Sequence, residues 1–305
     1  MNFVFLSPDD MLEYGIEFLH YKPSARTSKS TKTTAFKKFY GSSPLVLSNV
    51  WYDMCTTDIE ECQLNENERK LGGFKRFMIA NYFLWTYPRN SHQLACVFGM
   101  CERYSRGKPL WKWIQKIAAM RQKKIVWDPC LDRPDTEIFV VTVDGTDFRL
   151  NEVKHERYPI DRQMCSHKYN HASVKYEIAI SIFRPKCVWI NGPFRGGMND
   201  MDIFRMGLKQ KIAHGKIVVA DQGYRGKDDI EPLMISVPNK QDSKELNKFK
   251  SRARARHESF NGRLKFYQSL NTTFRHGFDK HKCVFEADCV LVQYLMYNGA
   301  EIFVV

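Results

Sequence analysis

The spacing of apolar residues changes near Trp127. Before that point it is helical, as in LGGFKRFMIANYFLWTY, where apolar side chains recur every three or four residues. Helices are also predicted in SPDDMLEYGIEFL, with Ser7 as its cap, and from Ser43, which precedes a proline at the first helical position. Two further helices are predicted in SHQLACVFG, capped by Ser91, and in LWKWIQKIAAMRQKK.

Strand-like runs follow Trp127. EIFVVTV, KYEIAISIF, KCVWING and KIVVAD are short, apolar and rich in β-branched residues, and they alternate with helical text such as MNDMDIFRMGLKQKI. This alternation predicts an α/β domain with a mixed sheet flanked by helices. From Asp242 the chain is predicted to be helical again, with Phe249, Ala253, Phe260, Leu264 and Tyr267 on one stripe. VFEADCVLVQYLMYNG predicts a last, buried helix.

The same change divides the chain into residues 1–123 and residues 124–305. Short helices with tight turns in the first region indicate either a helix-turn-helix DNA-binding module or an ordinary helical subdomain. In the first case, Arg103 and Arg106 are candidates to contact DNA, together with Glu102 and Tyr104. The polar and basic segment 21–40 predicts a linker or arm, either a solvated loop or a DNA contact.

Charge and cysteine content narrow the class of protein. Among 305 residues, 47 Lys and Arg stand against 34 Asp and Glu, a formal charge of +13 that suggests a polyanionic partner, most often nucleic acid and sometimes an acidic membrane surface. Nine scattered cysteines, without a CxxC pair, are typical of a reducing compartment and disfavour a zinc finger. We expect neither a membrane span nor a signal peptide, because the apolar stretches are short and MNFVFLSPDD lacks a basic start.

Three acidic residues are candidates for catalysis. Asp144 follows the apolar run FVVTV and Asp221 follows KIVVA, so each is predicted at the end of a buried strand. Glu258 lies in the basic segment KSRARARHESFNGRLKFY, on the polar helix face with Arg254, Asn261 and Lys265. Carboxylates suit Mg²⁺, and two such ions can cleave a phosphodiester while nearby cations hold the backbone.

The sequence suggests two other kinds of site. TVDGT resembles the DxDGT motif of haloacid-dehalogenase-like phosphatases, but Thr142 stands where that chemistry needs an aspartate nucleophile. His155, Cys165, His167 and His171 could bind zinc, although their spacing matches no standard site. Lys168, in the same segment, is a candidate phosphate contact.

Four segments together resemble DDE-superfamily transposases of the PIF/Harbinger type. These are VDGTD, GPFRGGMNDMDIFR, ADQGYRG and ARHESFNGRLKFY, around Asp144, Asp200, Asp221 and Glu258 respectively. CERYSRGKPLWKWIQKI, upstream, resembles part of the family's helix-turn-helix region. The resemblance runs from about Ser43 to the end of the chain, and it depends on the order and spacing of the segments.

The resemblance implies an RNase H-like catalytic core that binds two divalent ions, Mg²⁺ or Mn²⁺. Asp144, Asp221 and Glu258 would be the catalytic triad and the metal ligands, with Asp144 bridging the ions. Asp200 would be a supporting residue, because Asn199 replaces the histidine that usually precedes it in the family. Arg225, Arg254, Arg256 and Lys265 would bind DNA phosphates.

The implied reaction cuts a phosphodiester at a transposon end with water and then joins the freed 3′-OH to target DNA. The implied partners are double-stranded DNA, a separate Myb-like DNA-binding protein and further copies of the chain. Such a protein would act in the nucleus of a eukaryote, and otherwise in the cytoplasm.

Two alternatives remain at this point. The chain could be a co-opted, catalytically silent DNA-binding protein, although its complete triad favours activity. It could also be a basic α/β hydrolase that acts on small phosphate esters.

Overall fold

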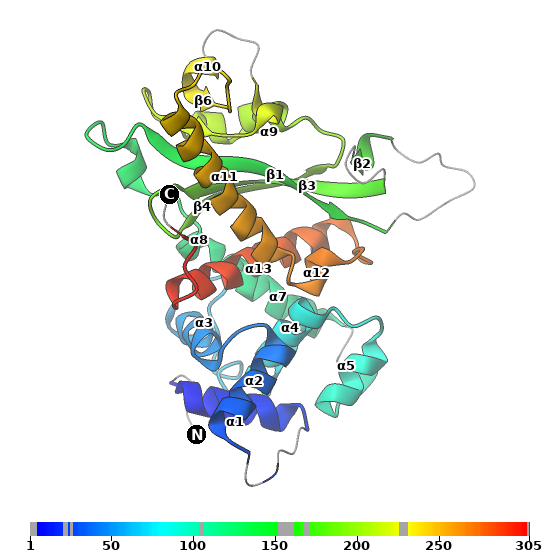
Figure 1. Ribbon diagram of the computed structural model, residues 1–305. Coiled ribbons are helices and arrows are strands. Elements are labelled where there is room, and N and C mark those ends of the chain that lie inside the picture. The colour runs from blue at the N-terminus through cyan, green and yellow to red at the C-terminus, as the bar shows by residue number, and fades with distance from the viewer. Residues whose placement is uncertain are drawn as a thin grey trace. The chain divides into compact units, whose positions relative to one another are not determined.

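In the computed structural model the chain forms two compact units (Figure 1). Unit 1 contains Met1–Lys124, Leu264–Thr272 and Cys283–Gly299, and unit 2 contains Ile125–Arg263, Thr273–Lys282 and Ala300–Val305. The predicted division between a helical DNA-binding region, residues 1–123, and a catalytic domain, residues 124–305, stays a prediction. The structure describes residues 5–20, 24, 27–103, 107–151, 162–166, 171–225, 231–303 and 305.

The described part of unit 1 is helical. Trp51 lies at its centre, with ring centroids 5.1 Å from Phe74, 5.3 Å from Phe77 and 6.1 Å from Trp113. Burial of such large rings gives the helices a common core. The helices are α1 (Pro8–Phe18), α2 (Lys29–Tyr40), α3 (Pro44–Thr56), α4 (Leu71–Thr86), α5 (Ser91–Phe98), α7 (Lys108–Ala119), α8 (Arg121–Lys124), α12 (Gln268–Asn271) and most of α13 (Phe278–Tyr297).

Two predicted helix starts are confirmed, since Ser7 caps α1 and Ser43 caps α3. The prediction for α5 was one residue late, because the side chain of Asn90 is the cap that accepts the Gln93 amide at 2.9 Å.

The prediction of a linker or arm at residues 21–40 is wrong for its second half. Helix α2 begins after Ser28, which caps it. Phe36 and Tyr40, one helical turn apart, are buried, and the Tyr40 hydroxyl donates to the Gly15 carbonyl at 2.8 Å. Two buried rings therefore hold a helix whose other residues are mostly polar or basic.

Unit 2 contains the mixed sheet that the sequence predicted. Its strand order is β2-β3-β1-β5-β6, and β4 also pairs with β3. The β1–β3, β3–β4 and β2–β3 pairs are antiparallel, whereas β1–β5 and β5–β6 are parallel. The strands are β1 (Phe139–Arg149), β2 (Cys165–Ser166), β3 (His171–Ser181), β4 (Cys187–Arg195), β5 (Ile217–Val219) and β6 (Ile235–Ser236).

Helices cover both faces of this sheet. On one face, Val143 and Val218 pack with Met201 and Phe204 of α9 (Asp200–Met206). On the other face, Val219 packs with Ala253 of α11 (Lys244–Leu264). Figure 1 shows α11 crossing the strands, with the short α10 (Glu231–Met234) near β6. Because side chains alternate along a strand, residues of one parity face α9 and those of the other face α11.

The pairing of β1 with β5 contains one irregularity. Phe139 pairs with Ile217, but Val141 pairs with Val218 and Thr142 with Val219. One extra residue of β1, Val140, is therefore accommodated before the register resumes.

All nine cysteines are free thiols. Among the described helices, none is long and apolar enough to cross a membrane.

Candidate active site

Asp144 and Asp221 lie on neighbouring strands and on the same face of the sheet. Each stands two residues beyond the Thr142–Val219 pair, so the parallel register places them side by side. Val219 packs against α11, whereas Val218 and Ala220 belong to the opposite core, and the alternation therefore turns Asp221 towards α11. Neighbouring strands are about 4.8 Å apart, which is close enough for two carboxylates to share a ligand.

One part of the sequence prediction for Asp144 is wrong. This residue does not end its strand, because β1 continues to Arg149 through pairing with β3. Asp221 does follow the end of β5, and its Oδ1 accepts the Gly223 amide at 2.8 Å. Antiparallel pairing with β3 extends β1 beyond the apolar run visible in the sequence.

Helix α11 lies along β1 through two polar contacts. Nδ1 of His257 lies 2.8 Å from Oγ1 of Thr142, and one helical turn later Nδ2 of Asn261 donates to Oδ2 of Asp144 at 3.1 Å. His257 and Asn261 are both buried. Burial lowers the pKa of His257 to about 3, so its ring is neutral at physiological pH.

The same contacts indicate where Glu258 points. Arg256, on one side of α11, donates to the Ser181 carbonyl of β3 at 3.2 Å. Glu258 is two residues further, about 200° around the helix, and is about 60° from Asn261. Its side of the helix is therefore the side of β5 and Asp221, and Glu258 is exposed there. That the three acids form one site stays a prediction.

Asp200 belongs to the opposite face of the same strands. Its Oδ1 forms an ion pair with Lys175 at 2.9 Å, and Lys175 also donates to the Met198 carbonyl at 2.8 Å. A Cβ on Gly145 would lie 2.5 Å from Asp200 Oδ1, so only glycine fits there without a shift. A Cβ on Gly223 would lie 3.1 Å from both Asp200 Oδ2 and Asp221 Oδ1, which makes these carboxylates neighbours.

Asn199, which occupies the position of the family's usual histidine, has a structural contact. Its side chain caps α9 by accepting the Met201 amide at 2.8 Å. Lys175 and the cap together fix the position of Asp200.

A buried acid behind the site was missed at the sequence level. Glu177 lies opposite Gly145 in the pairing of β1 with β3, and its Oε2 accepts the Trp189 indole at 3.1 Å. Burial, assisted by the charge of Asp200, raises the pKa of Glu177 to about 8, although the bond from Trp189 opposes this shift. The charged residues within the apolar run KYEIAISIF were the available signal.

The hydroxyl of buried Tyr224 is influenced by all of these acids. Burial raises the pKa of its hydroxyl well above the usual value, and the negative charges of Glu177, Asp200, Asp144 and Asp221 raise it further. The four carboxyl groups therefore all lie near enough to this buried hydroxyl to act on it.

The chemistry of these donors suits a hard divalent cation, because carboxylate oxygens are the ligands that Mg²⁺ and Mn²⁺ prefer. Across the part of the chain that the structure describes, no three His, Cys, Asp or Glu side chains stand close enough to form a complete metal site. The β1–β5 register makes Asp144 and Asp221 neighbours. Exposed Glu258 would have to turn towards them to complete a metal site.

The predicted cationic contacts differ in their surroundings. Arg225 and Arg103 are exposed, and Arg254 and Lys265 are partly exposed. Arg256 is buried, and its guanidinium donates to the carbonyls of Ser181, Arg184, Ile302 and Phe303. The structure therefore corrects the expectation that Arg256 contacts DNA. Arg106 and Lys168 lie outside the described residues.

The zinc alternative gains no support from the described residues. Cys165 is in β2, and Nδ1 of His171 lies 3.1 Å from the Ala172 carbonyl. His155 and His167 lie outside the described residues.

Part of the chain matches a known protein family. Residues 143–293 match the family model described as DDE superfamily endonuclease, and this segment includes Asp144, Asp221 and Glu258. The chain therefore contains a domain similar to DDE superfamily endonucleases, in agreement with a DDE transposase. Comparisons with curated proteins and with solved structures gave no significant match.

Proposed function

We propose that the protein is a DDE transposase of the PIF/Harbinger type, which cuts DNA at transposon ends and joins the freed 3′-OH to target DNA. The observation that carries the proposal is the pairing of β1 with β5, which puts Asp144 beside Asp221 on the face covered by α11. The match to DDE superfamily endonucleases supports it, because all three acids lie in the matched segment.

Asp144, Asp221 and Glu258 would hold two divalent ions, Mg²⁺ or Mn²⁺, in an RNase H-like core. When bound, such ions lower the pKa of water and stabilise the leaving oxygen of a phosphodiester. Asp200 would support the site from the other face through its ion pair with Lys175.

The protein's own residues orient the reacting groups. Nδ2 of Asn261 donates to Oδ2 of Asp144, which orients this carboxylate. Neutral His257 fixes α11 against Thr142 without adding charge beside the acids. Arg225, Arg254 and Lys265 would bind backbone phosphates, which contributes affinity that falls with salt concentration.

The substrate would be double-stranded DNA, both transposon end and target. Residues 1–123 would supply a helix-turn-helix-like DNA contact through Arg103 and Arg106. A Myb-like protein and further copies of the chain would complete the assembly, in the nucleus of a eukaryotic host or in the cytoplasm of a bacterial one.

The decisive experiment compares Asp144→Asn with wild type in DNA nicking. With Mg²⁺ or Mn²⁺, wild type should nick DNA, and Asp144→Asn should lower the rate about a thousandfold, about 4 kcal/mol of transition-state stabilisation. Asp135→Asn is the matched control, because Asp135 is an exposed aspartate of the same unit.

Two results would contradict the proposal. Salt-sensitive DNA binding without nicking under any divalent ion would indicate a silent, co-opted protein. Cleavage of p-nitrophenyl phosphate without any DNA requirement would indicate a small-ester hydrolase.

A further inference from the structure

A hollow of about 870 Å³ opens in unit 2 beside the candidate active site. It is lined by residues following β5 and β6, including Gln222, Arg225, Asn239 and Lys240. Both strands are parallel to β1, and ligands of parallel sheets bind outside the carboxyl ends of the strands. Gln222 directly follows Asp221, so the hollow adjoins the proposed cutting site.

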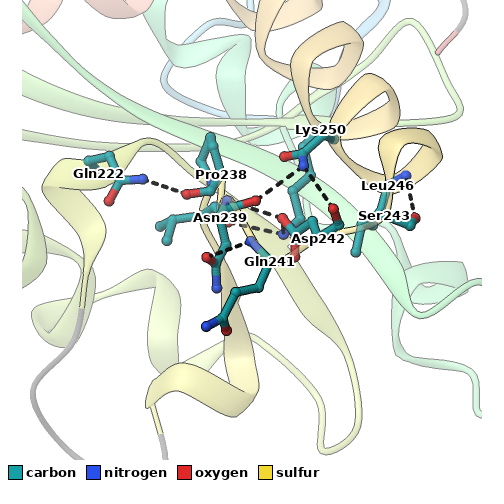
Figure 2. Close-up of polar contacts among 10 residues, drawn as sticks. Gln222, Pro238, Asn239, Gln241, Asp242, Ser243, Leu246 and Lys250 are labelled. Atoms are coloured by element: carbon teal, nitrogen blue, oxygen red, sulfur yellow. Dashed lines mark hydrogen bonds and ion pairs between the residues drawn. The ribbon is translucent and has the colours of Figure 1, made fainter.

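The wall of this hollow is held in place by hydrogen bonds (Figure 2). Buried Lys250 of α11 donates to the Val237 carbonyl at 3.0 Å and to Asp242 Oδ2 at 2.7 Å. Gln222 donates to the Pro238 carbonyl at 2.6 Å, which ties the two sides together. The hollow is therefore formed before any ligand binds, as is usual for small-molecule sites.

Its charge favours an anion. Arg225 and Lys240 are exposed at the hollow, and neither has an ion pair or a side-chain hydrogen bond within the described part of the chain. The acid in the lining, Asp242, is engaged by Lys250. Two cations thus remain for a ligand.

The size and chemistry of the hollow indicate a ligand larger than a phosphate ion. The volume lies in the range of about 300–1,000 Å³ typical of pockets that hold a whole small molecule. Asn239 and Gln241 supply amide groups of the kind that pair with base edges, and Val237 and Pro238 supply apolar surface. The buried ring of Tyr224 offers no stacking surface, so recognition would depend on hydrogen bonds and shape.

We propose that this hollow, between the turn after Asp221 and the loop after β6, binds one nucleotide of the DNA strand next to the phosphodiester being cut. Arg225 and Lys240 hold its phosphate, and the amides and the apolar wall receive its sugar and base. The assignment to DNA rests on the proposed function, whereas nucleotide binding itself is measured without any cleavage.

The test uses thymidine 5′-monophosphate as the probe, without divalent metal, in saturation-transfer-difference NMR with the full chain. We expect a dissociation constant of about 1 mM for this isolated nucleotide, with saturation of sugar and base protons. Thymidine and inorganic phosphate should each bind at least tenfold more weakly.

Two variants test charge and space separately. Arg225→Gln with Lys240→Gln removes the cations. Gln241→Trp fills the rim with a bulky side chain and keeps the hydrogen bond that the backbone N–H of residue 241 donates to Asn239 Oδ1. Each should weaken nucleotide binding at least tenfold. Arg133→Gln with Lys211→Gln is the matched control, because both are exposed cations of unit 2 away from the hollow. Circular dichroism and thermal unfolding establish that each variant is folded.

Three results would overturn the nucleotide site: no binding to wild type, equal binding by the rim variant, or inorganic phosphate binding as tightly as the nucleotide. A protein that binds the nucleotide here but never nicks DNA would contradict only the nuclease proposal.

Discussion

At the scale of single residues, charge alone did not reveal which arginines face solvent. Arg256 and Arg254 are two positions apart in one basic segment, yet Arg256 is 1% exposed and bonded to backbone carbonyls. Burial lowers the pKa of Arg256 to about 10. Its acceptors come from residues 181–184 and 302–303, which are distant in the sequence, so no local pattern could identify them.

This difference predicts opposite effects for the two arginines. Arg256→Met should lower the free energy of unfolding by about 3 kcal/mol, because four backbone carbonyls lose their donor. Arg254→Gln should leave the free energy of unfolding within about 0.5 kcal/mol of wild type and weaken DNA binding several-fold. Urea unfolding and fluorescence-anisotropy titrations measure the two quantities. Equal stability of the two variants would contradict the structural assignment of Arg256.

At the scale of elements, the apolar patterns located most of the sheet and many helices. EIFVVTV, KYEIAISIF, KCVWING and KIVVAD became β1, β3, β4 and β5, and the last apolar run became α13. The patterns could not show which strands and helices lie side by side. That arrangement determines the extension of β1 past Asp144, the position of Glu177 opposite Gly145, and the contacts of Lys175 with Asp200 and of Asn261 with Asp144.

The contact between α11 and β1 leads to a prediction about Asn261. Asn261→Leu leaves Oδ2 of Asp144 without this donor, so nicking should fall about tenfold to a hundredfold, as for other residues that orient metal ligands. The variant should remain folded, with a loss of about 1–3 kcal/mol. Single-turnover nicking as a function of Mg²⁺ concentration is the measurement, and a higher Mg²⁺ requirement is expected. Ser259→Ala on the same helix is the control, and an equal effect of that change would exclude a specific role for Asn261.

At the scale of the whole molecule, buried titratable groups should set the pH of greatest stability. Burial lowers the pKa values of His257 and His281 to about 3, and it raises that of Glu177 to about 8. Unfolding therefore takes up protons at both histidines when the pH is below about 6.5. It releases a proton from Glu177 when the pH lies between about 4.5 and 8.

The free energy of unfolding should consequently be highest near pH 6.5. Below it, the histidines lower stability by about 1.4 kcal/mol per pH unit each as the pH falls towards 3, partly offset by Glu177 down to about pH 4.5. Above it, Glu177 lowers stability as the pH rises to 8. Urea unfolding from pH 5 to 8 measures the profile. Glu177→Gln should make the decline above pH 6.5 shallower but not abolish it, because burial also raises the pKa of Asp288 and this group still releases a proton on unfolding. A decline as steep as that of wild type would contradict the explanation.

The single extra residue in β1, before its register with β5 resumes, has a consequence for how the protein could lose activity. One further residue inserted between Val140 and Asp144 would put Val143 rather than Asp144 beside Asp221, and the two carboxylates would then point to opposite sides of the sheet. A one-codon insertion at an apolar position would thus abolish the proposed activity while every acidic side chain in the gene stayed intact. A search for the motif residues alone would count such a copy of the gene as functional.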